Sequence, residues 1–276
     1  MQTIQESAKQ RVLLAAHRGV AGGNIPCNSI ASYEIALNQG ADIVEIDVSV
    51  SADRKLFVFH PGMERPHLNI PTRLADMPAV EIEKLVFTNQ DNVPCTDKIA
   101  TLDEVLDLLK GKAYVNIDKF WTAVPEITEC VRRHGMQNDV IVKTSADKKW
   151  FDMVEQIAPE LPYMPIIRST DRVSEELLGR KINFIGAEVL FYNDADAVAS
   201  PEYIQWMHDH GLLLWANAIV YNCKEQIAAG HSDDVAMVSD PDGSWGWLVD
   251  RGFDIIQTDW QLPCRMYLEA TNRRYR

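Results

Sequence analysis

The segment DIVEIDVSVSADRKLFVFH, residues 42–60, contains two apolar runs of strand length joined by the polar turn ADRK. This turn is shorter than the dozen or more residues that connect parallel neighbours, so the two runs are expected to form an antiparallel hairpin. If the turn is centred after Asp53, Asp47 lies opposite His60. The hairpin therefore predicts that a carboxylate and an imidazole meet at one point.

Outside this hairpin, apolar runs of strand length alternate with segments of helical period. The runs are rich in Val and Ile and mostly apolar on both faces, which is typical of parallel strands covered by helices. The nine predicted strands are residues 12–17, 42–50, 56–60, 113–118, 139–144, 161–167, 182–190, 212–218 and 253–259. A barrel of this type has eight strands, and the hairpin accounts in part for the ninth predicted strand. We therefore expect one (β/α)₈ TIM barrel over residues 1–276, with the antiparallel hairpin near its second strand.

Several helices between the strands have readable ends. Thr101 and Glu104 form a capping box before an apolar stretch, and Gly111 follows as a stop. Two further helices are expected from Asn28 or Ser29 to Gly40, and from Ser200-Pro201 to Gly211.

The region of about 62–100, after His60, is rich in Pro, Asn and Asp and contains no clear strand. We expect a small insertion over the mouth of the barrel, where specificity usually resides. Its Arg65 and His67 are expected to lie in a solvated loop.

Composition excludes several classes of protein. The 276 residues are 46% hydrophobic and 24% charged, and no apolar run approaches the ~20 residues of a membrane span. The net charge of −13, from 27 basic and 40 acidic residues, argues against a general affinity for nucleic acid or anionic lipid. A small phosphate-bearing substrate remains possible if a bound cation reverses the local field.

The five cysteines are scattered and show no CxxC pair. This spacing argues against a disulfide framework and against a zinc site. The N-terminal segment lacks the apolar core of a secretory signal, so a cytoplasmic location is expected, or a periplasmic or secreted one if a leader was removed.

Charged residues within apolar strands are the first candidates for chemistry. His17 and Arg18 end the first predicted strand, where polar side chains face the catalytic mouth of a barrel; a capped strand end is the alternative. Glu45 and Asp47 share one face of a buried strand. Two adjacent buried carboxylates need a proton, a basic partner or a metal, and a solvent-facing strand is the alternative.

A divalent cation between these carboxylates would require a third acidic ligand. Asp118 ends a later strand and is the candidate, although it could equally be a capping residue; Lys119 follows it. Lys143 and Glu188 are further charges inside apolar strands, and such a lysine needs a partner or a ligand.

Taken in order, AAHRG, GADIVEIDVSVSADRKLFVFH, IATLDEVLDLL and FDIIQTDW resemble the landmarks of the glycerophosphodiester phosphodiesterases. The resemblance extends from His17 to Trp260. It implies a barrel enzyme that uses a divalent cation, Mg²⁺ or Ca²⁺.

The resemblance also implies roles for individual residues. Glu45 and Asp47 look like two metal ligands, and Asp118 stands where the family usually has a Glu. His17 and His60 look like the acid and base pair. Arg18 looks like a phosphate-binding residue, and Lys119 and Lys143 are further candidates for substrate contacts. Trp215 and Asn217 resemble a late-strand position that lines the family's pocket, with core packing as the alternative, and Phe120 and Trp121 are candidates for the same wall.

Besides Asp118, three positions depart from the family pattern. Cys27 replaces a Glu before the first helix, and Pro61 replaces the Asp that commonly follows the second histidine. The lysine that usually lies two residues after the third ligand is shifted to Lys119, leaving Phe120 in its place.

The expected activity is metal-dependent hydrolysis of a small glycerophosphodiester to glycerol 3-phosphate and an alcohol. Direct attack by water and ring closure through a cyclic phosphate are both consistent with these residues. One alternative is a phospholipase D- or C-like enzyme acting on a lipid headgroup. Another is a barrel that binds phosphorylated ligands without catalysis.

Overall fold

Eight parallel strands form a closed barrel in the computed structural model, which describes residues 1–168, 172–221 and 224–276. In order around the barrel they are β1 (Leu13–Ala16), β2 (Ile43–Val50), β6 (Tyr114–Asp118), β7 (Val140–Ser145), β8 (Tyr163–Ile167), β9 (Gly186–Val189), β10 (Leu213–Asn217) and β13 (Ile255–Thr258). The pairing of β1 with both β13 and β2 closes the barrel. All nine predicted strands are present, and the (β/α)₈ barrel is confirmed.

The ninth predicted strand, β3 (Leu56–Val58), pairs antiparallel with β2, as expected. The predicted register is wrong by one residue, because Val48 faces Val58 and Phe59 therefore falls opposite Asp47. Arg54 adopts a left-handed conformation with φ of 66°, and the Ser51 N–H bonds to the Lys55 carbonyl. This geometry makes a loop of three residues, whereas the prediction assumed a loop with an even number of residues.

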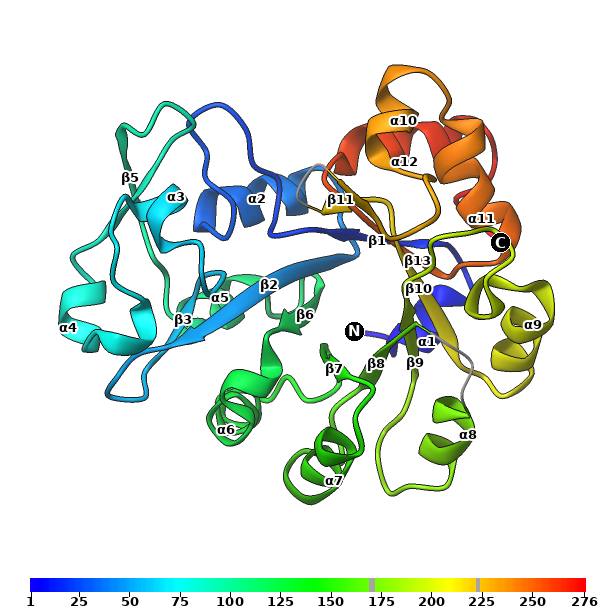
Figure 1. The fold of residues 1–276 in the computed structure, drawn as a ribbon, viewed down its shortest axis with the longest axis horizontal. Helices are drawn as coiled ribbons and strands as arrows, with labels where there is room; N and C mark the ends of the chain where they lie inside the picture. The colour runs from blue at the N-terminus through cyan, green and yellow to red at the C-terminus, as the bar shows by residue number, and fades with distance from the viewer. Residues whose placement is uncertain (169–171, 222–223) are drawn as a thin grey trace.

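Helices cover the outside of the barrel, and α6, α7, α8 and α9 surround its strands in Figure 1. The helices are α1 (Ile4–Ala8), α2 (Ile30–Asn38), α3 (Glu64–Leu68), α4 (Ala79–Ile82), α5 (Leu102–Leu109), α6 (Val124–His134), α7 (Lys148–Ile157), α8 (Val173–Leu178), α9 (Pro201–Asp209), α10 (Asp233–Val238), α11 (Trp247–Arg251) and α12 (Gln261–Ala270). The predicted caps are confirmed for α2 at Ser29, for α5 at Thr101 and for α9 at Ser200. No helix in the described ranges is long and apolar enough to cross a membrane.

The segment 62–100 contains more regular structure than its composition predicts. Besides α3, α4 and the short 3₁₀ helix η1 (Leu74–Asp76), it forms a two-stranded antiparallel sheet of β4 (Val86–Thr88) and β5 (Pro94–Lys98). The expectation of no strand was wrong because these strands are short and β5 is polar and mostly exposed. The segment projects to one side of the barrel, at the left of Figure 1.

Inward-facing side chains fill the barrel in layers. The lower layer is apolar, and it includes Leu13, Ala15, Ile43, Tyr114, Ile141, Met164, Leu213, Trp215 and Ile255. Alternate residues of a strand point to one side, and above the apolar layer this face carries a polar residue on every barrel strand except β8, which places Ile166 there. The polar layer includes His17, Glu45, Asn116, Lys143, Glu188, Asn217 and Gln257. The interior of the barrel is therefore polar at the C-terminal ends of the strands and apolar below them.

Between β10 and α10 the chain also forms a small hairpin of β11 (Val220–Tyr221) and β12 (Glu225–Gln226). Tyr221 of β11 and Glu225 of β12 line the pocket that the polar layer forms.

Candidate active site

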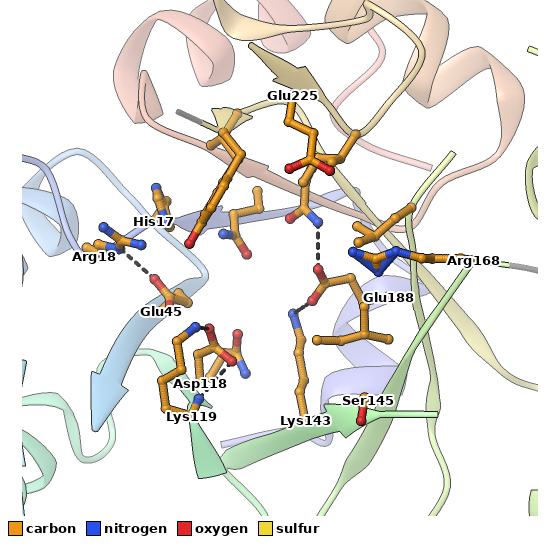
Figure 2. Close-up of a pocket in the computed structure, with 18 of the residues that line it drawn as sticks. His17, Arg18, Glu45, Asp118, Lys119, Lys143, Ser145, Arg168, Glu188 and Glu225 are labelled. Atoms are coloured by element: carbon orange, nitrogen blue, oxygen red, sulfur yellow. Dashed lines mark hydrogen bonds and ion pairs between the residues drawn. The ribbon is translucent and has the colours of Figure 1, made fainter. Parts of the chain in front are cut away.

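A pocket of about 440 Å³ opens at the C-terminal end of the barrel strands. Six predicted site residues line it, namely His17, Arg18, Glu45, Asp118, Lys119 and Lys143. They come from strands far apart in the chain and face a common space in Figure 2. Asn217 and Trp121 also lie in the wall, as expected.

Glu45 is the most deeply placed acid of the pocket, with 2% of its surface exposed. Its Oε2 accepts a hydrogen bond of 2.8 Å from the backbone N–H of Arg18. Burial, followed by the neighbouring charge of Asp47, raises the pKa of Glu45 to about 7. An uncompensated pair of buried carboxylates is thus unfavourable here, as the sequence predicted.

Asp47 is fully buried and is surrounded by cations. Its Oδ2 lies 2.9 Å from Arg18 Nε and accepts a hydrogen bond of 2.9 Å from Asn28 Nδ2. Burial favours the neutral form, but the charges of Arg18, Lys119 and His60 outweigh burial and lower the pKa of Asp47. The carboxylate is therefore held ionised.

Asp118 and Lys119 turn back into the pocket at the end of β6. Lys119 adopts a left-handed conformation with φ of 59°, which L-residues populate sparsely. Its ammonium contacts Asp118 Oδ2 and lies 3.6 Å from Asp47 Oδ1. The lysine that is shifted relative to the family pattern therefore still reaches the acidic cluster.

The three acids fit a divalent cation. One oxygen from each of Glu45, Asp47 and Asp118 lies within 4.8 Å of the others. Asp47 Oδ1 is buried and has no hydrogen-bond partner within the described ranges. Converging carboxylate oxygens are the ligands that Mg²⁺ and Ca²⁺ prefer.

His17 is held by a carboxylate that the sequence analysis did not assign to the site. Its Nδ1 lies 2.8 Å from Asp259 Oδ1. Burial lowers the pKa of His17, but the hydrogen bond and charge of Asp259, together with the charge of Glu45, outweigh burial and raise it. Asp259 is in turn fixed through its backbone N–H, which donates to Asp233 Oδ2 at 2.7 Å.

His60 lies near Asp47, with 4.0 Å between Nε2 and Asp47 Oδ1, although the observed register places Phe59 and not His60 directly opposite Asp47. It lies in a small adjoining cavity rather than in the wall of the main pocket, and Arg18 lines both spaces. Neither ring nitrogen has a hydrogen-bond partner in the described part of the chain. Burial, followed by the charges of Arg18 and Lys119, keeps the pKa of His60 below its usual value, although Asp47 opposes this.

Lys143 crosses the floor of the pocket in an ion pair. Its Nζ donates to Glu188 Oε2 at 2.7 Å, and Asn217 Nδ2 donates to Glu188 Oε1 at 2.7 Å. The same ammonium lies 3.1 Å from the centre of the Trp215 ring. Figure 2 shows the Lys143–Glu188 ion pair across the pocket from Glu45 and Asp118.

Two aromatic expectations differ from the structure. Trp215 is fully buried in the apolar layer and does not line the pocket, because Asn217 occupies the layer above it on the same strand face. Phe120 is also fully buried, in the core outside the barrel. Of the residues after His60, Arg65 is exposed as expected, whereas His67 is partly buried and lines the small cavity beside His60.

Asn28 and Asp259 are the site residues that sequence reasoning missed. Asn28 was considered only as a helix cap, yet it bonds Asp47, and Tyr33 fixes its amide by donating to Oδ1 at 2.9 Å. Asp259 directly follows β13, so its place at the carboxyl end of a barrel strand was the available signal.

Comparison with known proteins gives a match to one family model and matches to curated relatives and solved structures. A family model described as a domain of unknown function, DUF4996, matches residues 163–268. The glycerophosphodiester phosphodiesterase of Bacillus subtilis (strain 168) is 28% identical over 230 residues, which cover 74% of this chain and 75% of that protein. This homology supports the glycerophosphodiester phosphodiesterase family for the chain.

Solved structures share the barrel of this family. A glycerophosphoryl diester phosphodiesterase from Parabacteroides distasonis ATCC 8503 superposes with a TM-score of 0.76 at 16% identity, over 95% of this chain and 88% of that one. A phosphodiesterase of Oleispira antarctica, in complex with the product sn-glycerol-3-phosphate, has a TM-score of 0.68 at 17% identity, over 93% of this chain and 96% of that one.

Proposed function

We propose that the protein hydrolyses a glycerophosphodiester to glycerol 3-phosphate and an alcohol. The observation that carries the proposal is the convergence of Glu45, Asp47 and Asp118 beside the paired His17. The relative from Bacillus subtilis and the product-bound neighbour support a substrate of this class. A phosphodiesterase would be expected to neutralise phosphate charge and to transfer protons at both ends of the broken bond.

Glu45, Asp47 and Asp118 are proposed to hold one divalent cation, Mg²⁺ or Ca²⁺. When bound, such an ion supplies positive charge to the phosphate oxygens. Arg18 pairs with Asp47 in the structure, and Lys119 pairs with Asp47 and Asp118. Both cations also lie where they can contact the phosphate, and Arg18 is suited to this task because its guanidinium offers several donors in a fixed plane.

His17 is proposed to act as the general acid. The Asp259 carboxylate accepts from Nδ1, which stabilises the imidazolium and leaves Nε2 to protonate the departing alcohol oxygen. The raised pKa of His17 keeps the proton in place until it is needed.

His60 is proposed to act as the general base. Its pKa is lowered and its ring nitrogens have no hydrogen-bond partner among the described residues, so the imidazole can accept the proton of the attacking oxygen. Arg18 lines the spaces on both sides, so a phosphate that it binds lies between the two imidazoles.

Lys143 and Trp215 are proposed to act together on the substrate side of the pocket. Lys143 faces the pocket, and Trp215 supports its ammonium from below. The pair sets the charge of the wall that faces the glycerol or the headgroup.

The decisive experiment is turnover of glycerophosphocholine by the purified protein with Mg²⁺ or Ca²⁺. We expect release of glycerol phosphate that EDTA abolishes and that His17→Ala lowers by at least 100-fold. Ligand binding without turnover in the wild type would instead favour a non-catalytic barrel.

A second candidate substrate is a lysophospholipid, and a specific cavity favours it. A space of about 520 Å³ shares His17 and Arg18 with the main pocket and is walled by Val20, Trp260 and Leu262. Trp260 is 47% exposed, so an acyl chain could lie along this apolar wall. Faster turnover of lysophosphatidylcholine than of glycerophosphocholine would select this candidate.

A further inference from the structure

A second cluster of metal-ligating side chains lies on the outside of the barrel, where α5 packs against α6. Asp103 belongs to the first turn of α5, and Cys130 and His134 lie four residues apart on α6. One ligand atom from each of the three lies within 4.8 Å of the others. All three residues lie outside the catalytic pocket.

His134 is oriented as a metal-ligating histidine would be. Its Nε2 lies 2.8 Å from Asp103 Oδ1, and its Nδ1 lies 3.0 Å from Asp107 Oδ1. A histidine that binds metal through one nitrogen usually donates the other N–H to a carboxylate, which fixes the tautomer and the ring. Asp107 lies where that carboxylate is required, and Nε2 points into the cluster, where it contacts Asp103.

Cys130 contributes a sulfur that is almost completely buried, with 1% of the residue exposed. Burial, followed by the charge of Asp103, raises the pKa of this thiol to about 12. A cation at the cluster would reverse that effect, because metal-bound cysteine is a thiolate.

A positive charge already occupies the cluster. The guanidinium of Arg133 contacts Asp103 and lies 3.5 Å from Cys130 Sγ. Its side chain is 54% exposed, so it can withdraw into solvent without leaving a buried charge behind.

We propose that Asp103, Cys130 and His134 bind a transition-metal ion of the zinc type, with water as the remaining ligand. Sulfur, imidazole nitrogen and carboxylate oxygen are the donors that zinc accepts, whereas Mg²⁺ and Ca²⁺ prefer oxygen alone. Ligand atoms of a tetrahedral zinc site lie about 3.3–3.8 Å apart, so small side-chain rotations complete the site. The bound ion would join α5 to α6 and stabilise the folded chain.

The sequence expectation of no zinc site rested on the absence of a CxxC pair. A search for closely spaced cysteines does not find the proposed ligands, because Asp103 and His134 lie 31 residues apart and meet only through helix packing. The four-residue spacing of Cys130 and His134 places both on one helix face.

The test is titration of the metal-free, reduced protein with Co²⁺, followed by absorption spectroscopy. We expect a thiolate-to-cobalt charge-transfer band whose intensity at saturation corresponds to one thiolate-bound cobalt per chain. Cys130→Ser should abolish the band, and His134→Gln should weaken binding at least tenfold. Cys95→Ser, which removes a cysteine outside the cluster, should leave the band unchanged. Cobalt held by the three carboxylates of the pocket gives no thiolate band and does not interfere.

Arg133→Gln keeps all three ligands and removes the competing charge, so it should bind Co²⁺ at least threefold more tightly than the wild type. This variant tests the proposal even if Cys130→Ser or His134→Gln does not fold. No charge-transfer band in the wild type, a band that persists in Cys130→Ser, or unchanged affinity in Arg133→Gln would overturn the proposal.

Discussion

Removal of the carboxylate that holds His17 tests the acid role directly. Asp259→Asn replaces the partner of Nδ1 while keeping its size, and the bond of 2.8 Å then joins neutral groups. A hydrogen bond between a charged pair contributes about 1.5–3 kcal/mol. Because 52% of the Asp259 side chain is exposed, water weakens the interaction, and the lower end of this range applies. We therefore expect kcat/KM for glycerophosphocholine to fall about tenfold.

The pH profile adds a second, independent readout. Asp259 helps to raise the pKa of His17, so its removal lowers that pKa. A general acid must be protonated, and activity is lost as pH rises through its pKa. The alkaline limb of kcat/KM should therefore move to lower pH in Asp259→Asn.

The chain offers a matched control in the His231–Asp194 pair. Its nitrogen and oxygen are also 2.8 Å apart, and 53% of the Asp194 side chain is exposed. Asp194→Asn should leave kcat/KM and its pH profile unchanged. An Asp259→Asn enzyme with less than a threefold loss and an unmoved alkaline limb would refute the acid role of His17.

Three further predictions concern buried groups. Burial raises the pKa of Asp233 to about 6 from 3.8. As pH falls from 7 to 4, the free energy of unfolding of the wild type should therefore rise by up to about 3 kcal/mol relative to that of Asp233→Asn. Chemical denaturation at both pH values measures this difference, and a difference that does not change with pH would contradict the prediction. Lys143→Met leaves the Glu188 carboxylate unpaired and should cost about 3–5 kcal/mol, whereas the double change to Lys143→Met and Glu188→Gln should recover most of it in the same assay. His60→Ala should lower kcat at least 100-fold with an unchanged melting temperature, and retained activity would remove the proposed base.

Most of the barrel follows from local patterns. Parallel strands buried on both faces give continuous apolar runs, and all nine runs became strands. The helices with Ser, Thr and Gly at their ends were equally readable. The short strands β4 and β5 were not, because a polar, exposed ribbon such as β5 carries no apolar period.

The positions of pocket residues were predictable where the residues lie on one strand. They were less predictable where a backbone angle determines which way a side chain points. Glu45 and Asp47 follow from simple alternation along β2. The hairpin register depended on the left-handed Arg54, and the reach of Lys119 depends on its own φ of 59°. Neither angle is visible in the order of residues.

Depth along a strand and contacts between distant segments were the remaining obstacles. Trp215 and Asn217 share a face of β10, but only Asn217 stands high enough to reach the pocket. Asp259 pairs with His17 across 242 residues, so closure of the barrel is what creates that contact.

The most direct test of the central claim is a crystal structure of the protein soaked with Mn²⁺ or Ca²⁺ and sn-glycerol 3-phosphate. We predict a single cation at about 2.0–2.6 Å from oxygens of Glu45, Asp47 and Asp118, with the phosphate between His17 and His60. Absence of metal density among these carboxylates at saturating concentration, or a phosphate bound away from both imidazoles, would contradict the account.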